Sequence, residues 1–309
     1  MRVLVAGATS VPGLPLLREL RAAGHEAIGL TRSEAKTPQI AEGGAKPVVA
    51  DVFDAHQIEA VVADIEPDVV VSLLTTLPRR GPMWLRDFDA ATELWSRGVP
   101  NLVTAAQQAG ARRIVTESVI FAYGYPSSGS AMLDESDPYP GPPPPGGAKM
   151  LGALRGMEQT VLASGKNSRT EGIVLRYGLF YGDGLPHTEW MSRLIKWRAL
   201  PVPRGNGVVS WIEIGDVARA TVAALDRGRG GEIYNIVDDH PTSFADYVRG
   251  MAAALHRPRP LTLPRGLVRL FAPYVATAFA EARVPVSNAK AKEELGWAPR
   301  ITQSVTRSR

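Results

Sequence analysis

The sequence predicts an α/β fold of the doubly wound kind, in which helices cover both faces of a parallel sheet and a small C-terminal lobe is added. Three observations predict it. Short apolar runs rich in β-branched residues recur along the chain, segments with helical spacing alternate with them, and a glycine-rich turn follows the first run. Strands and helices that alternate in this way form βαβ units, whose crossovers are right-handed almost without exception.

The first strand and the first helix show how each element is assigned. Residues 1–6 (MRVLVA) are an apolar run typical of a buried parallel strand. In the helix predicted over 14–23, Leu16, Leu17 and Leu20 share one face, and Gly24 ends it. By the same criteria the further strands are 26–30, 46–49, 68–74, 113–116, 172–176 and 233–237, and the further helices are 57–65, 90–108, 244–255, 264–271 and two that begin near Ala148 and at Asp216.

Composition excludes several classes of protein. The 309 residues include no cysteine, so disulfides and thiolate chemistry are absent, and the five histidines lack metal-ligand spacing, so no metal site is expected. No apolar stretch of about 18 residues or signal peptide is apparent, which predicts a cytoplasmic protein without a membrane partner. The net charge of +4 is spread along the chain, so nucleic-acid binding is not expected.

The glycine-rich turn between the first strand and helix reads Gly7-Ala8-Thr9-Ser10-Val11-Pro12-Gly13. A helix N-terminus offers unpaired N–H groups and partial positive charge, which suit the pyrophosphate of a dinucleotide. Glycine permits the tight turn and the close packing of helix on strand. Ser10 stands where glycine is usual, which a negative φ would allow. We therefore expect a Rossmann-type site in which the dinucleotide contacts Gly7, Thr9, Ser10, Val11 and Gly13.

The end of the second strand bears on the choice of cofactor. NAD enzymes place an acid there to hold the ribose hydroxyls. This chain reads Gly29-Leu30-Thr31-Arg32-Ser33, with no acid before Glu34. Arg32 can pair with a 2′-phosphate through its planar guanidinium. The sequence therefore favours NADP(H), with NAD(H) as the alternative.

Several further segments resemble the extended short-chain dehydrogenase/reductase family, in its NAD-dependent epimerase/dehydratase branch. The resemblance covers nearly the whole chain and rests on the order and spacing of the glycine turn and of 50–54 (ADVFD), 98–106 (GVPNLVTAA), 113–124 (RIVTESVIFAYG), 175–184 (LRYGLFYGDG), 212–218 (IEIGDVA), 234–236 (YNI) and 295–299 (LGWAP). It implies that the cofactor is also lined by Asp51, Val52, Leu74, Thr75, Thr76, Tyr177 and Leu179.

The resemblance also implies a domain organisation. Residues 1–182 would form the NAD(P)-binding Rossmann domain, to which strand elements near 208–237 return. Residues 183–309 would form mainly a substrate-binding lobe, because 183–212 and 238–300 interrupt the alternation of strands and helices. A sugar nucleotide is the small-molecule substrate that the resemblance implies, with a cyclic ketone as the alternative. A homodimer is one expectation for the assembly, and the sequence does not fix the oligomeric state.

The family's catalytic Y-x-x-x-K is missing, which makes this an atypical member. If Lys149 is the family lysine, Pro145 takes the place of the tyrosine. If instead Glu158 is aligned with the acid of the family's helix, Met150 replaces the tyrosine and Leu154 the lysine; this second alignment keeps the spacing to the strand over 172–176. The family serine falls on Val119, so Ser118 is one residue early, and one residue reverses the face of a strand.

We predict Ser118, Tyr123 and Lys149 as the catalytic residues, with other polar groups as alternatives. The proline-rich segment 137–147, with six prolines and three glycines, is expected to form a rigid wall of the active site. The alternatives for the acid or base are Glu117, Tyr125, Tyr139, Tyr177, Tyr181, His187 and Glu189. Three tryptophans could stack on a flat or cyclic substrate, although core packing is the favoured interpretation: Trp190, Trp197 and Trp211.

Three functions are consistent with this pattern. The first is an NADP(H)-dependent oxidoreductase or epimerase with a non-standard acid or base. The second is a non-redox isomerase, lyase or cyclase on the same scaffold. The third is a non-catalytic protein that senses NADP. Net hydride transfer, seen in the absorbance of the reduced nicotinamide, would indicate an oxidoreductase. Turnover without a net change in that absorbance would fit a non-redox enzyme or an epimerase that regenerates its cofactor, and cofactor binding without turnover would fit a sensor.

Overall fold

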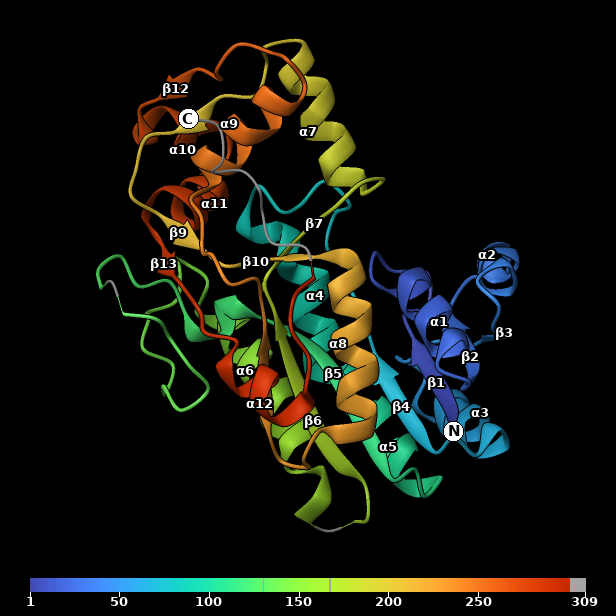
Figure 1. Cartoon of the computed structure of the whole chain (residues 1–309). Helices are drawn as coiled ribbons and strands as arrows, with labels where there is room; N and C mark the ends of the chain where they lie inside the picture. Colours follow the sequence, from blue (N-terminus) through green and yellow to red (C-terminus); the bar gives the residue numbers. More distant parts are fainter. Residues whose placement is uncertain (130, 167, 301–309) are drawn as a thin grey trace.

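A seven-stranded parallel sheet forms the centre of the molecule in the computed structural model, which describes residues 1–129, 131–166 and 168–300 (Figure 1). The strand order is β11-β6-β5-β4-β1-β2-β3, and all neighbours run parallel. The predicted α/β fold is therefore confirmed. The strands are β1 (Arg2–Ala6), β2 (Glu26–Thr31), β3 (Lys46–Val49), β4 (Val69–Ser72), β5 (Arg113–Val119), β6 (Glu171–Tyr177) and β11 (Ile233–Ile236).

Helices cover both faces of this sheet. On one face, α1 (Gly13–Ala22) packs beside α8 (Ile214–Arg227), and on the other α3 (Ala55–Ile65), α5 (Val99–Gln108) and α6 (Ala148–Leu162) lie side by side (Figure 1). Each layer buries its own apolar cluster, one around Leu17 and Val71 and one around Leu4 and Leu102. Two apolar layers on one sheet explain why the strands read as continuous apolar runs rather than as alternating patterns.

The long helix predicted over 90–108 is interrupted. The structure has α4 (Asp89–Glu93), a π-helical turn over Leu94–Gly98, and then α5. Pro100 lies in the first turn of α5 and has no N–H to donate to the preceding turn, which explains why the regular hydrogen-bond ladder changes here. The strand predicted over 113–116 continues to Val119, in register with β6 as far as Tyr177.

A smaller group of elements gathers at the carboxyl end of the sheet (Figure 1). Three two-stranded parallel pairs support it, and each joins segments distant in sequence: β7 (Leu179–Tyr181) with β10 (Trp211–Glu213), β8 (Val202–Pro203) with β12 (Thr262–Leu263), and β9 (Val208–Val209) with β13 (Arg283–Val284). Its helices are α7 (Pro186–Lys196), α9 (Phe244–Ala254), α10 (Arg265–Phe271) and α11 (Pro273–Ala276). Sequence reasoning missed α7 and α11, together with α2 (Thr37–Glu42) and α12 (Ala289–Leu295).

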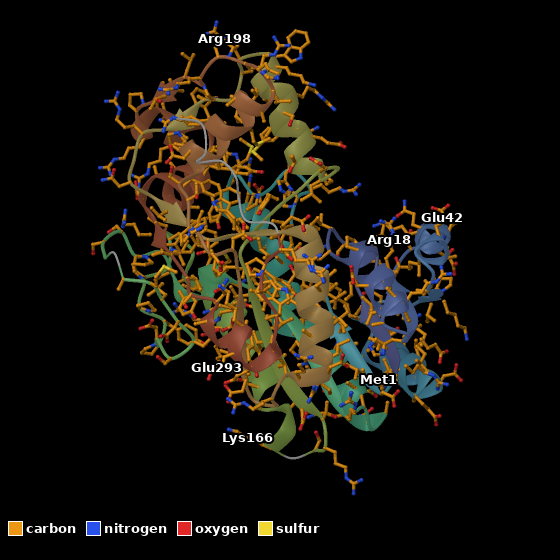
Figure 2. The ribbon with its side chains drawn as sticks, viewed as in Figure 1. Met1, Arg18, Glu42, Lys166, Arg198 and Glu293 are labelled. Atoms are coloured by element: carbon orange, nitrogen blue, oxygen red, sulfur yellow. The ribbon has the colours of Figure 1, made fainter. Side chains whose placement is uncertain are left out.

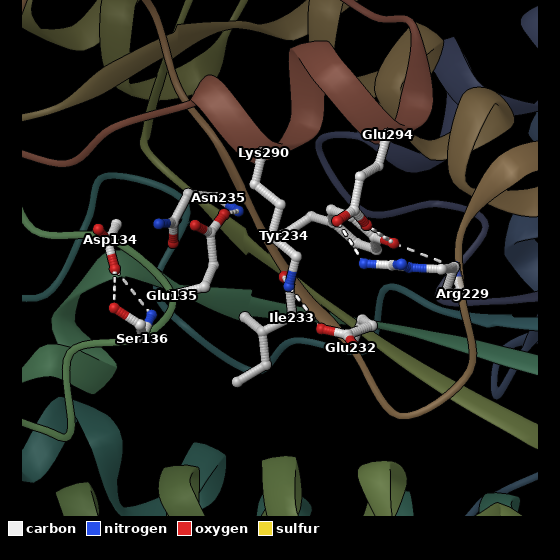
Figure 3. A network of polar contacts seen from close by, with 10 residues as sticks. All are labelled: Asp134, Glu135, Ser136, Arg229, Glu232, Ile233, Tyr234, Asn235, Lys290 and Glu294. Carbon is white, nitrogen blue, oxygen red and sulfur yellow. Dashed lines mark hydrogen bonds and ion pairs between the residues drawn. The ribbon is translucent and has the colours of Figure 1, made fainter.

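The edge strand β11 is held by polar contacts on both sides (Figure 3). The backbone N–H of Asn235 donates to Glu135 Oε1 at 2.7 Å, and Lys290 of α12 donates to the carbonyl of Ile233 at 3.0 Å. The hydroxyl of Tyr234 donates to Glu294 Oε2 at 2.8 Å. These contacts connect the segment before the proline-rich loop and α12 to the sheet.

Charged side chains are distributed over the surface, and those labelled in Figure 2 are all exposed: Arg18, Glu42, Lys166, Arg198 and Glu293. No helix in the described residues is both long and apolar enough to span a membrane. The same residues contain no cluster of three or more side chains suited to hold a metal ion.

Candidate active site

A cleft of about 920 Å³ lies between the carboxyl edge of the sheet and the smaller group of helices. The sheet contributes the ends of its strands, among them Leu30, Glu117 and Tyr177. The other wall comes from residues such as Trp190 and Val268. Ligands of open α/β sheets bind at this edge, where the carboxyl ends of the strands diverge.

The glycine turn leaves no room for side chains at its two ends. Gly7 has φ of +83°, and a Cβ there would lie 2.3 Å from the carbonyl oxygen of Leu73. A Cβ on Gly13 would lie 2.4 Å from the carbonyl oxygen of Ala8. Ser10 is not among the residues with positive φ, so serine is tolerated at this position. The turn therefore packs closely against the neighbouring backbone, as predicted from the glycines at its two ends.

Polar atoms without partners mark the same end of the cleft. Among the described residues, the hydroxyl oxygens of Ser10 and Thr76 are buried and make no hydrogen bond, and both residues line the cleft. No side chain caps the N-terminus of α1, which begins soon after Ser10. Unpaired hydroxyls beside a helix N-terminus fit an anionic group such as a pyrophosphate.

The residues predicted to hold the cofactor lie along this cleft, with one exception. Gly13 is buried behind the turn, where its role is packing. Lys36 also lines the cleft with Arg32, both side chains are exposed, and sequence reasoning did not single out Lys36. The remaining predicted cofactor residues that line the cleft are Gly7, Thr9, Ser10, Val11, Arg32, Asp51, Val52, Leu74, Thr75, Thr76, Tyr177 and Leu179.

Ser118 lies at the cleft, but its hydroxyl points into a buried ionic network. Its Oγ donates to Glu158 Oε1 at 2.6 Å. Glu158 is wholly buried and binds Arg176 through two bonds, 2.9 Å from Nε to Oε1 and 2.7 Å from an Nη atom to Oε2. This arrangement agrees with the one-residue offset noted in the sequence, and it gives Ser118 a structural partner in place of a substrate.

Tyr123 is not placed at the cleft, contrary to its predicted catalytic role. The ring is fully buried, and its hydroxyl donates to the carbonyl of Asp134 at 2.8 Å and lies 3.1 Å from Asn235 Oδ1. The guanidinium of Arg176 stacks 4.4 Å from the ring centre. Burial raises the pKa of Tyr123 to about 12. The cause is the short 3₁₀ turn Ile120–Tyr123, which ends the strand alternation and turns the ring into the core.

Tyr123→Phe is expected to leave the turnover number unchanged and to lower the free energy of unfolding by about 1–3 kcal/mol, because Asn235 loses a buried partner. Steady-state kinetics and urea denaturation measure the two effects. A turnover number reduced 100-fold in a folded protein would restore Tyr123 to the chemistry.

Lys149 is exposed on α6 and does not line the cleft, so the structure gives no support to its predicted catalytic role. The cleft is met instead by Met150, Leu151 and Leu154 of the same helix. This placement favours the alignment that puts Met150 and Leu154 at the tyrosine and lysine positions. The proline-rich segment 137–147 also lies away from the cleft lining, so its prediction as a wall of the site was wrong.

The other candidate groups are mostly occupied. His187 Nε2 lies 2.8 Å from the carbonyl oxygen of Phe180, and burial lowers its pKa. Tyr125 and Tyr274 share a hydrogen bond of 2.8 Å between their hydroxyls. Glu189 is exposed, and neither it nor Trp197, which is 80% exposed, reaches the cleft. The hydroxyls of the other candidate tyrosines also make hydrogen bonds, Tyr139 with Glu158, Tyr177 with Thr221 and Tyr181 with Asp238.

Aromatic rings dominate the half of the cleft opposite the glycine turn. Phe121 stacks on Tyr125 with ring centres 4.8 Å apart, and Phe88 meets Tyr274 edge-on at 4.8 Å. The aromatic residues that line the cleft there are Phe88, Trp95, Phe121, Tyr125, Trp190, Trp211, Phe244, Phe271, Tyr274 and Phe279. Sequence reasoning named Trp190, Trp211 and Tyr125, but not the rings that the chain brings from 88–95 and 244–279.

Comparisons with known proteins agree with this geometry. The model of the family described as "NAD dependent epimerase/dehydratase family" matches residues 3–237. The chain belongs to that family. A 3-diazoavenalumate denitrifying reductase of a Streptomyces species is 36% identical over 97% of this chain and 96% of the relative. A 4-hydroxy-2-methyl-3-oxo-4-farnesyl-3,4-dihydroquinoline-1-oxide ketoreductase of Stigmatella aurantiaca is 25% identical over 98% and 93%.

Solved structures show the same fold. A UDP-glucose 4-epimerase of Thermotoga maritima, solved with UDP-glucose, superposes with a TM-score of 0.78 at 18% identity, covering 98% of this chain and 94% of that one. Membership of the epimerase/dehydratase family and the named relatives make the protein an NAD(P)-dependent oxidoreductase or epimerase. The tight glycine turn and the unsatisfied hydroxyls of Ser10 and Thr76 fit the nicotinamide dinucleotide that this family uses.

Proposed function

We propose that this protein is an NADP(H)-dependent reductase that transfers hydride to an aromatic acid without the family's tyrosine. The observation that carries the proposal is the side of α6 that faces the cleft, where Met150 and Leu154 stand in place of a proton donor and its lysine. A bound reduced nicotinamide supplies a hydride. The residues around it here exclude water and position the acceptor, and they do not include a tyrosine–lysine pair.

The substrate class follows from the lining of the cleft. The rings around Phe121, Tyr125 and Tyr274 suit a flat conjugated molecule, because aromatic pairs gain from offset stacking and edge contacts. Arg79 and Arg80 line the cleft with exposed side chains and can pair with a carboxylate. These features support an aromatic acid over the sugar nucleotide or cyclic ketone implied by the family resemblance.

A substrate that loses dinitrogen would not need the family's tyrosine, because its reduction by hydride requires no proton donor. When hydride adds to the ring carbon of an aryl diazonium, the C–N bond breaks, its electron pair leaves with dinitrogen, and a C–H bond forms. No oxyanion develops, so no proton donor is required. The 36% identical relative carries the name of a diazo-acid reductase, which supports this class for the present chain.

The cofactor form is the second part of the proposal. Arg32 and Lys36 follow β2 and line the cleft, whereas Glu34, the first acid after that strand, does not line it and so is not placed to hold a ribose 2′-hydroxyl. A 2′-phosphate would gain charge-assisted hydrogen bonds from Arg32, while an unphosphorylated ribose would not.

Arg32→Ala is expected to weaken NADPH binding by about 10- to 100-fold and to leave NADH binding nearly unchanged, because one charge-assisted hydrogen bond contributes about 1.5–3 kcal/mol. Fluorescence titration with each cofactor measures the change. Arg18→Ala, on the outer face of α1, is the matched control and should alter neither constant (Figure 2). Equal losses for both cofactors, or tighter binding of NADH by the wild type, would contradict the preference.

The reaction is tested with three substrates, an aryl diazonium carboxylate, a cyclic ketone and UDP-glucose. The reduced-nicotinamide absorbance is followed, and the products are identified because epimerisation causes no net change in that absorbance. We expect consumption of NADPH with the diazonium acid, with one dinitrogen and one arene formed per hydride. Turnover of UDP-glucose, or reduction of the ketone alone, would overturn the proposed substrate. Binding of NADPH without turnover of any compound would favour a sensing protein.

A further inference from the structure

Among the described residues, one carboxyl group in the cleft has a buried oxygen that makes no hydrogen bond. Glu117 lies on β5, opposite Leu175 of β6, and the residue lines the cleft. Its Oε2 is buried and makes no hydrogen bond among the described residues. Buried polar atoms are nearly always paired, so an unpaired carboxyl oxygen at a binding site indicates a group that meets a ligand.

The surroundings of Glu117 carry little charge. The residue shares its face of the sheet with Arg113, whose guanidinium reaches the end of α8. Tyr177 on β6 is the titratable neighbour, and its hydroxyl is bonded to Thr221 of α8. The charged residues at the start of α8, Asp216 and Arg219, pair with each other.

Because no cation compensates its burial, the pKa of Glu117 is raised to about 8. The carboxyl is therefore protonated at neutral pH, unlike an exposed glutamate. It can then respond to a charge brought into the cleft by a ligand.

The position of Glu117 along the cleft identifies the part of the ligand that it meets. The glycine turn after β1 takes the pyrophosphate, and Arg32 and Asp51 lie on the β2–β3 side, where the adenosine half belongs. Strands β5 and β6 lie on the opposite side of β1, with β4 between. Glu117 and Tyr177 therefore face the nicotinamide half. That ring is cationic when oxidised and neutral when reduced.

We propose that Glu117 couples proton binding to the redox state of the cofactor: it keeps its proton on Oε2 when a neutral ring occupies the cleft and releases it to solvent when a cationic ring does. At neutral pH the resting carboxyl then offers no negative charge to the oxidised form. A reductase benefits from this arrangement, because it must bind the reduced form and let the oxidised form leave.

The coupling has a definite sign. Below about pH 8, binding of the oxidised form requires loss of the proton from Glu117, so its dissociation constant falls as pH rises. Binding of the reduced form requires no such loss. A cation within about 4–6 Å lowers a carboxyl pKa by about 1–3 units. The ratio of the two dissociation constants, oxidised over reduced, is therefore expected to fall by about 10- to 100-fold between pH 6 and pH 9.

The experiment is isothermal titration of the full chain with NADP⁺ and with NADPH from pH 6 to pH 9, in two buffers of different ionisation enthalpy. The buffer pair reports the protons released on binding. Any titration of the 2′-phosphate or of the groups around it is common to both cofactors and cancels in the ratio. No substrate is needed, so the outcome is independent of the proposed reaction.

We expect wild-type protein to release a proton with NADP⁺ and not with NADPH at pH 7. Glu117→Gln should abolish both the release and the pH dependence of the ratio. Glu135→Gln is the matched control, since burial also raises the pKa of Glu135, but this residue lies beside Asn235 away from the cleft (Figure 3). A flat wild-type ratio, a wild-type slope in Glu117→Gln, or failure to bind either cofactor would overturn the proposal. The wild-type measurement decides even if the variant does not fold.

Discussion

Glu158→Ala is expected to lower the free energy of unfolding by about 3–5 kcal/mol, a large part of the stability of a domain of this size. The substitution leaves the guanidinium of Arg176 buried, 2% exposed, with no carboxylate beside it. It also removes the acceptor of Ser118 Oγ. Urea denaturation followed by circular dichroism measures the loss, which should appear as a lower midpoint at unchanged slope.

Glu93→Ala provides the matched control for this prediction. Glu93 also forms an ion pair with an arginine, Arg97, but both side chains are exposed, by 56% and 62%. Exposed pairs contribute about 0–1 kcal/mol, so the loss should be correspondingly small. An equal loss of unfolding free energy in the two variants would show that the buried ion pair contributes no more to stability than an exposed one.

Ser10→Glu is expected to weaken binding of either nicotinamide dinucleotide by two to three orders of magnitude. Ser10 lines the cleft at the glycine turn, and its conformation accepts a side chain, so the variant should fold. A carboxylate here would meet the pyrophosphate, and two like charges about 4 Å apart repel by about 4 kcal/mol at an effective dielectric constant of 20. Fluorescence titration of the reduced cofactor measures the affinity.

Ser10→Gln separates charge from bulk, because glutamine has nearly the size of glutamate. It should weaken binding by less than about tenfold. If Ser10→Glu bound the cofactor as tightly as the wild type, the pyrophosphate could not lie at the glycine turn.

Most of the sheet could be predicted because strands that are buried on both faces have continuous apolar sequences. The strand predicted over 46–49 coincides with β3, the one over 26–30 is one residue shorter than β2, and the one over 172–176 is one residue shorter than β6 at each end. The small helices were harder. In α7 the apolar residues cover one narrow side, and the start signal, Pro186 in the first turn, is also a common loop residue. The π turn before Val99 precedes Pro100, and because proline is also common in the first turn of an uninterrupted helix, the sequence did not mark the break.

The site could be predicted where backbone geometry dictates the residue, and less well where a side chain's direction matters. Glycine at positions 7 and 13 follows from close backbone contacts, so the motif located the turn. The role assigned to Tyr123 depended on which way a short turn points its ring. Glu117 was visible as a charged candidate, but its lack of a partner is a property of the assembled sheet. The same holds for the aromatic wall, which collects rings from distant segments.

The small paired strands at the carboxyl end of the sheet set the order in which the two walls of the cleft can form during synthesis. Strands β1 to β6 have all emerged once the chain reaches Tyr177, whereas β8 waits for Thr262 and β9 for Arg283. Contacts of long sequence separation form late, and nascent chains fold from the N-terminal side. The half-built protein therefore exposes Trp211 and Phe244, which the finished molecule buries. A chain that ended before residue 262 would have the glycine turn but would lack the rings of Phe271, Tyr274 and Phe279 that complete the aromatic wall of the cleft.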